Sequence, residues 1–275
     1  MTDTSPVPRV TTNYVHGYAT TESQRLRDQS EILRDLFHGD TVYEPGSRVL
    51  EVGCGVGAQT RIVARQNAAA QFTCLDVSAA SIAQAQAAAT GTGLTNVAFE
   101  CVDAYQFQPR GSLFDHAYFC FVLEHVPEPE RLLRRVASLV RPGGSVIAIE
   151  GDHGSTFFHP PSAAAWRTIQ CLIDLQAACG GDALIGRRLY PLFCDSGLAN
   201  VRVSPRVVYA DPSREDWVEM FTDRTYIAMV EGVRERALAA ELISVEDWDN
   251  GIAELRRTKA GTFSYTFFKA VATVP

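Results

Sequence analysis

The feature that most constrains this chain is the segment 48–57 (RVLEVGCGVG), in which an apolar run breaks into three alternating glycines. A strand, a tight turn and the start of a helix account for this order, because glycines let backbone N–H groups approach a ligand closely. The segment therefore predicts a cofactor-binding turn. On its own it is a weak signal, since Gly53, Gly55 and Ala58 also satisfy a loose dinucleotide fingerprint.

Strand and helix patterns alternate through most of the chain. The expected strands are 48–52, 71–75, 97–102, 114–121, 145–149, 201–208 and 262–274, and a helix at 20–37 precedes them. This alternation predicts an α/β fold, with a doubly wound, mostly parallel sheet covered by helices on both faces.

Three regions divide the chain in this interpretation. Residues 1–46 form an N-terminal helical lid segment, 47–208 plus 262–275 form the ligand-binding core, and 209–261 form an inserted helical cap. The insertion carries too many large apolar side chains for a solvated linker, although a dimer interface explains them nearly as well. The N-terminal segment and the insertion are therefore also the candidate surfaces for a homo-oligomer.

Composition narrows the class of partner. A chain of 275 residues with 46% hydrophobic content can bury one large core. A net charge of −7 argues against a protein that binds nucleic acid. Small-molecule substrates are then the expectation. Seven single cysteines without a CxxC pair, no apolar run of membrane length and a polar start at 1–8 lead us to expect a cytoplasmic protein that binds no membrane.

Two aspartates end expected strands. Asp76 lies 19 residues past Gly57, about the spacing at which a doubly wound fold places a carboxylate on a ribose, and Asp103 ends the next strand. Each could instead only cap the turn that follows it.

The acidic Glu51, two residues before Gly53, sharpens the first motif. With Gly55 and Gly57 it resembles the acidic-x-Gly-x-Gly-x-Gly motif of the class I S-adenosylmethionine-dependent methyltransferases. The resemblance covers about 47–208 and 262–275, and it implies a seven-stranded sheet whose last strand runs antiparallel. Segments 14–37, 150–154 and 184–188 look like a bacterial group of small-molecule methyltransferases related to quinone and natural-product methylation, some of which methylate indole carbon.

The resemblance also implies a cofactor, S-adenosylmethionine, and its product, S-adenosylhomocysteine. Glu51 would lie near the methionine ammonium, Asp76 would take the ribose hydroxyls, and Asp103 with Ala104 would meet the adenine. Tyr14 and Tyr18 would either close over the ligand or pack the first helix down. The expected cofactor-binding residues are Glu51, Gly53, Gly55, Gly57, Asp76, Val77, Asp103, Ala104, Phe119, Tyr14 and Tyr18.

The expected catalytic residues follow the fifth strand, where the ligand crevice of an open sheet lies. His153 is the first candidate for a general base, with Asp152 or Glu150 fixing its tautomer. The alternative is that His153 only bonds the backbone of the turn expected at 150–154. His125 is expected to be structural. Glu150, Asp152, His153 and His159 are all metal-ligand types, but their spacing fits no known cage, so no metal is expected.

These features predict an enzyme that moves a methyl group from S-adenosylmethionine to a small aromatic or heteroaromatic acceptor, at carbon, nitrogen or oxygen; an indole-like natural product is one such acceptor. Three alternatives stay open. The first is a nicotinamide-dependent reductase, which is disfavoured by Glu51 and by the absence of an obvious Tyr-x-x-x-Lys pair. The second is an RNA or protein methyltransferase, and the acidic net charge of the chain disfavours an RNA substrate. A non-catalytic cofactor-binding module, or a relative that uses the bound cofactor for another reaction, is the third.

Overall fold

A seven-stranded sheet forms the centre of the protein, in a computed structural model that describes residues 20–275. The strand order is β3-β2-β1-β4-β5-β7-β6; β1 to β5 run parallel, and β7 runs antiparallel to both β5 and β6. The doubly wound sheet with an antiparallel last strand is thereby confirmed. The strands are β1 Arg48–Val52, β2 Gln71–Asp76, β3 Val97–Cys101, β4 Phe114–Cys120, β5 Val140–His159, β6 Ala199–Ala210 and β7 Thr262–Thr273.

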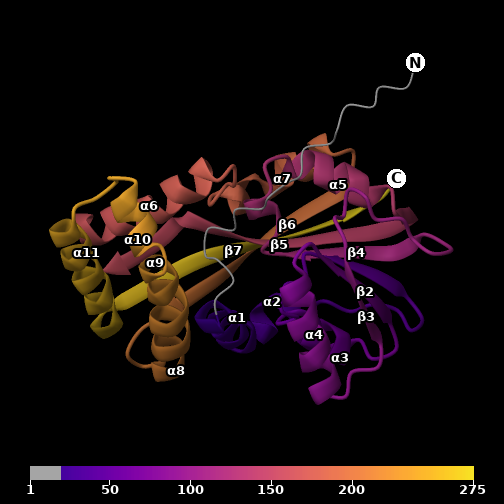
Figure 1. The fold of residues 1–275 in the computed structure, drawn as a ribbon, viewed down its shortest axis with the longest axis horizontal. Coiled ribbons are helices and arrows are strands. Elements are labelled where there is room, and N and C mark those ends of the chain that lie inside the picture. The colour runs from indigo at the N-terminus through magenta and orange to yellow at the C-terminus, as the bar shows by residue number, and fades with distance from the viewer. Residues whose placement is uncertain (1–19) are drawn as a thin grey trace.

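Helices cover both faces of the sheet (Figure 1). Helices α3 (Thr60–Gln66) and α4 (Ala79–Gly91) bury Val63 and Ile82 against one face, where β1 and β2 contribute Val49 and Phe72. Helices α5 (Pro129–Ala137) and α7 (Leu189–Asp195) pack on the opposite face in a second apolar cluster. The two clusters hold the sheet from both sides, so the strand ends are fixed in position.

The N-terminal helix is interrupted, contrary to the single helix expected over 20–37. Helix α1 (Thr20–Ile32) ends before Leu33, and a short helix α2 (Arg34–His38) follows. The buried Lys269 of β7 explains how α2 is held, because its ammonium group donates to the Phe37 carbonyl at 3.1 Å and to the Asp40 carboxylate at 2.7 Å. This contact ties the segment after α1 to strand β7 of the sheet.

Strand β5 is much longer than the expected 145–149. It continues to His159 because it pairs with β7 beyond Ile149, with Gly151 opposite Phe267 and Asp152 opposite Thr266, before a bulge. The segment 150–154 is therefore strand and not the expected turn. Pairing with a distant strand has overridden the local turn signal of two glycines and an aspartate.

The region between β6 and β7 is helical, as expected for 209–261. Its elements are α8 Glu215–Trp217, the π-helix η3 Val218–Ile227, α9 Ala228–Glu231, α10 Arg234–Ala239, α11 Val245–Arg257 and η4 Thr258–Ala260. In Figure 1 these helices gather with α6 (Ala163–Ala178) at the end of the molecule where β5 and β7 project. The remaining short helices are η1 Leu123–His125 and η2 Ile185–Arg188. Within the described part of the chain, no helix combines the length and apolar character that crossing a bilayer requires.

Candidate functional site

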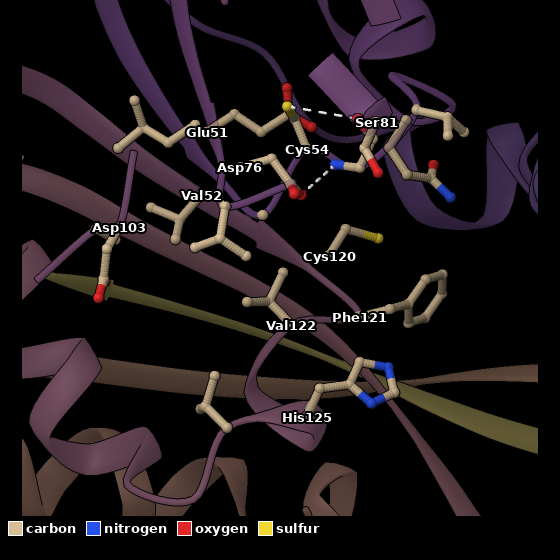
Figure 2. Close-up of a pocket in the computed structure, with 18 of the residues that line it drawn as sticks. Glu51, Val52, Cys54, Asp76, Ser81, Asp103, Cys120, Phe121, Val122 and His125 are labelled. Atoms are coloured by element: carbon tan, nitrogen blue, oxygen red, sulfur yellow. Dashed lines mark hydrogen bonds between the residues drawn. The ribbon is translucent and has the colours of Figure 1, made fainter. Parts of the chain in front are cut away.

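A cavity of about 260 Å3 lies at the carboxyl ends of β1, β2, β3 and β4, and we call it the larger cavity. This is the edge of an open parallel sheet at which ligands bind. Figure 2 shows its side chains, with Phe121 and His125 on the side away from Asp103 in that view. Of the expected cofactor-binding residues, those that line it are Glu51, Gly53, Gly55, Asp76, Val77, Asp103 and Ala104.

Two of the three motif glycines have different tasks. Gly55 has a φ of +52° and no atom within 4 Å of where a side chain would begin, so its backbone faces open space in the larger cavity. At Gly57, with a φ of +75°, an added Cβ would lie 3.1 Å from the Cβ of Ala85. Gly57 does not line the cavity; it lets the turn pack closely against α4.

Asp76 ties the glycine turn to the end of β2. Its Oδ2 accepts the backbone N–H of Gly55 at 2.9 Å and its Oδ1 accepts that of Ser78 at 2.8 Å. Asp103 similarly accepts the N–H of Tyr105 at 2.9 Å. Both aspartates thus cap turns and also line the larger cavity, and a carboxylate oxygen that accepts one N–H still has a lone pair for a ligand hydroxyl or amine.

Glu51 is buried at the base of the larger cavity. Burial raises the pKa of its carboxyl to about 7, and the nearby Asp76 adds to the rise; among the residues that the structure describes, no cationic side chain contributes. Arg48 is not its partner, because the Arg48 guanidinium bonds to Ser112 and lies 4.9 Å over the ring of Phe114. A buried carboxylate at the wall of a cavity, with no counter-ion from residues 20–275, fits a cationic ligand group such as an ammonium.

The raised pKa of Glu51 makes ligand binding depend on pH. Below about pH 7 the carboxyl is protonated and cannot pair with an ammonium, so affinity for S-adenosylmethionine should rise from pH 6 to pH 8 by up to about tenfold. Calorimetric titrations at both pH values measure this. Glu51→Gln should flatten the dependence, and an equally steep dependence in that variant would assign it to another group.

Phe119 was expected at the cofactor, but the structure buries it in the core and places Phe121 at the cavity instead. The reason is a left-handed residue directly after β4: Phe121 has a φ of +59°, which turns its ring toward Phe37 and Phe267. Such a conformation costs about 1–3 kcal/mol and clusters at functional sites. Tyr14 and Tyr18 lie outside the described residues.

A second cavity, of about 40 Å3, adjoins the first, and we call it the aromatic cavity. Phe121 and His125 line both. Five aromatic rings and a few polar groups converge on it from α1, η1, β5, η3, α9, β7 and the residue after β4. Its lining residues are Arg25, Gln29, Phe121, Glu124, His125, Gly151, His153, Phe221, Thr225, Tyr226, Met229, Tyr265 and Phe267.

His153 is the only one of the three expected catalytic residues that lines the aromatic cavity. Its Nδ1 lies 2.9 Å from the Tyr265 hydroxyl, and burial lowers the pKa of the imidazole to about 4. The imidazole is therefore neutral near pH 7. The expectation that Asp152 or Glu150 fixes its tautomer is wrong, because Tyr265 is the partner.

Asp152 and Glu150 hold other parts of the protein. Arg187 binds Asp152 through two hydrogen bonds of 2.8 Å. Glu150 is fully buried and accepts the backbone N–H groups of the turn that carries η1, at 3.1, 2.8 and 3.4 Å from Val122, Leu123 and Glu124. Glu150 thus fixes the wall between the two cavities, and its contacts are with the protein itself.

Sequence reasoning missed most of the aromatic cavity. The sequence places Glu124 and His125 at the ligand crevice after the fourth strand, with His125 expected to be structural, but the rings of η3 and β7 are separated from His153 by more than 60 residues. No local pattern points to them. The one available signal was the density of large side chains in 209–261, which predicted a packed surface but not which residues face the ligand.

No group of three or more His, Cys, Asp or Glu side chains within residues 20–275 is placed to hold a metal ion. The segment 150–159 explains this, because Asp152 is paired with Arg187 and Glu150 is bonded to backbone.

Comparison with known proteins points to one family. Residues 49–144 match the methyltransferase domain family. A ubiquinone biosynthesis O-methyltransferase of Neisseria meningitidis is 31% identical over 129 residues, which is 46% of this chain and 52% of that protein. The 27-O-demethylrifamycin SV methyltransferase of Amycolatopsis mediterranei is 29% identical over 133 residues, 48% of each chain. The chain spans about half the length of these curated relatives.

Solved structures share the fold. The cyclase SpnF superposes with a TM-score of 0.56 at 24% identity, covering 90% of this chain and 82% of that one. The Haemonchus contortus phosphoethanolamine N-methyltransferase 2 in complex with S-adenosyl-L-methionine has a TM-score of 0.53 at 14% identity, covering 92% and 52%. With the domain match, the sheet order and the acidic glycine turn taken together, the chain carries a class I S-adenosylmethionine-dependent methyltransferase domain.

Proposed function

We propose that this protein transfers a methyl group from S-adenosylmethionine to a small aromatic or heteroaromatic acceptor. The observation that carries the proposal is the shared wall of the two cavities. Phe121 and His125 face both a larger cavity with three carboxylates and a smaller one enclosed by aromatic rings. A cofactor in the first and an acceptor in the second would meet at these two side chains.

In this proposal each carboxylate of the larger cavity binds a different part of the cofactor. Glu51 binds the methionine ammonium, Asp76 accepts the ribose hydroxyls, and Asp103 accepts from the adenine amine. S-adenosylmethionine, when bound, supplies an electrophilic methyl group on a sulfonium centre. Methyl transfer needs in-line positioning and exclusion of water more than it needs acid–base chemistry, so the chain acts mainly by placing and enclosing the two reactants.

The aromatic cavity supports a flat acceptor. The ring centroid of Tyr265 lies 5.5 Å from that of Tyr226 and 4.6 Å from that of Phe267. Phe221 packs against two of these rings, with centroids 6.1 Å from Tyr265 and 6.0 Å from Phe267. Such rings exclude water and stack on planar ligands. At about 40 Å3 the cavity admits only the reacting end of an acceptor unless a flexible side chain such as Met229 moves.

A labelled-methyl assay tests the proposal. The protein is incubated with S-adenosylmethionine carrying a 13C-methyl group and a panel of phenols, indoles, quinones and amines, and products are read by mass spectrometry. We expect transfer to at least one aromatic acceptor, at a rate that does not depend on salt. Cofactor binding with no transfer to any acceptor would favour the non-catalytic module, and methylation of RNA lost at high salt would favour a nucleic-acid substrate.

A further inference from the structure

We infer that Tyr265 is a positioning residue that fixes His153 in the tautomer with its proton on Nε2, so that the aromatic cavity presents a hydrogen-bond donor to the acceptor. The tautomer follows from the contacts of the two side chains alone. The consequence for the acceptor rests on the proposed function and narrows its class to aromatic rings that carry an oxygen lone pair, as a phenolate or carbonyl oxygen.

The Tyr265 hydroxyl has one hydrogen-bond acceptor among the described residues, Nδ1 of His153. Both side chains are buried, and the Tyr265 oxygen lies 2.9 Å from Nδ1 of His153. The backbone N–H of Asp152 also stabilises this oxygen, but an N–H group can only donate. Among the described residues, Nδ1 is therefore the acceptor that satisfies the hydroxyl hydrogen. An unsatisfied buried hydroxyl would cost about 1–3 kcal/mol, which favours this arrangement over the reverse.

A missing side chain on β5 makes room for this contact. A Cβ added at Gly151 would lie 2.4 Å from the Tyr265 hydroxyl oxygen. Gly151 is therefore the position at which β5 lets the hydroxyl reach the imidazole two residues along the strand. The ring of Tyr265 is itself held by Tyr226 and Phe267, with centroids at 5.5 and 4.6 Å. The hydroxyl thus has little freedom to turn away.

The other imidazole nitrogen opens on the cavity. Nε2 of His153 makes no hydrogen bond to the described residues, and it is not among the polar side-chain atoms that are sealed from solvent without a partner. Because His153 lines the aromatic cavity, Nε2 reaches the space that an acceptor would occupy. A neutral imidazole whose Nδ1 accepts must carry its hydrogen on Nε2, so the atom facing the acceptor is a donor.

Other groups at the aromatic cavity complete the recognition of an oxygen-bearing ring. Besides Tyr226 and Tyr265, the ionisable side chains that share the cavity with His153 are Arg25, Glu124 and His125. The Glu124 carboxylate is buried and held by contacts of 3.4 Å to Gln176 and to His125. A donor at Nε2 and an acceptor at Glu124 suit a ring that offers an oxygen lone pair next to an O–H or N–H group. An alkyl ammonium offers no lone pair to Nε2.

Histidine-ring 15N NMR of the full chain tests the tautomer directly. His153 is assigned by the signals missing from His153→Gln. In the wild-type protein we expect Nε2 to carry the proton and Nδ1 to be an unprotonated hydrogen-bond acceptor. Tyr265→Phe should shift the population toward the Nδ1–H form. Tyr226→Phe is the matched control, because it removes a hydroxyl that bonds to Thr156 from a ring that contacts the same imidazole, and it should leave the tautomer unchanged.

A proton on Nδ1 in the wild-type protein would overturn the inference, and this result needs no variant to fold. An unchanged tautomer in Tyr265→Phe would equally remove the positioning role. Neither measurement requires methyl transfer, so the tautomer can be established even if the proposed function fails. For the acceptor class, 2-hydroxybenzaldehyde is compared with indole and benzylamine in the labelled-methyl assay, and transfer to benzylamine but not to the oxygen-bearing ring would overturn it.

Discussion

Replacing Asp76 with alanine should weaken S-adenosylmethionine binding by at least tenfold. A hydrogen bond to a charged group contributes about 1.5–3 kcal/mol, and each 1.4 kcal/mol is a factor of ten in affinity. The variant also releases the Gly55 and Ser78 N–H groups that this carboxylate holds, so the glycine turn loses its tie to β2. Isothermal titration with S-adenosylmethionine and with S-adenosylhomocysteine measures the loss.

Asp115→Ala is the matched control for this experiment. Asp115 also accepts a backbone N–H at the start of β1, from Arg48 at 2.8 Å, but it does not line either cavity. Its removal should leave cofactor affinity within about twofold of the wild-type value. Wild-type affinity in Asp76→Ala would show that Asp76 serves only the turn and would remove its proposed contact with the ribose.

Replacing Glu150 with alanine should destabilise the fold by about 3–5 kcal/mol, because three backbone N–H groups of the buried turn before α5 lose their acceptor. Glu150→Gln should retain most of the stability. Burial raises the pKa of Glu150 well above its usual range, so the neutral amide resembles the protonated acid in charge and shape. Denaturant unfolding of both variants gives the two free energies.

The surface variant Glu235→Ala is the control for Glu150, since its side chain is 86% exposed and its loss should change stability by less than about 0.5 kcal/mol. If Glu150 instead carried a proton during the reaction, Glu150→Ala would fold as stably as the control while Glu150→Gln would lose turnover. That pattern would return Glu150 to the catalytic role expected from sequence and contradict the structural role described above.

The cofactor side of the site could be predicted from the sequence because its signals are local. Glu51, Gly55 and Asp76 each lie within a few residues of a strand end, and strand ends in an alternating α/β pattern meet at one edge of the sheet. Gly57 and Phe119 lie outside the larger cavity for reasons that no sequence pattern shows. Gly57 packs on α4, and the left-handed backbone of Phe121 brings the ring of Phe121, not that of Phe119, to the ligand side.

The acceptor side could not be predicted because its contacts are distant in sequence. His153 and its partner Tyr265 are 112 residues apart, and the pairing of β5 with β7 that brings them together also turns the expected loop 150–154 into strand. The choice of Asp152 and Glu150 as partners of His153 rested on sequence proximity. In the structure Arg187 binds the Asp152 carboxylate, and the backbone N–H groups of the turn before α5 donate to Glu150.

The central claim is that one ligand lies across the larger cavity with its reactive end toward the aromatic cavity. A crystal structure of the protein with S-adenosylhomocysteine tests it most directly. We predict the ribose hydroxyls at Asp76, the adenine amine at Asp103, the amino group at Glu51, and the sulfur facing Phe121 and His125. Adenosine bound elsewhere, or a sulfur turned away from the aromatic cavity, would contradict the account.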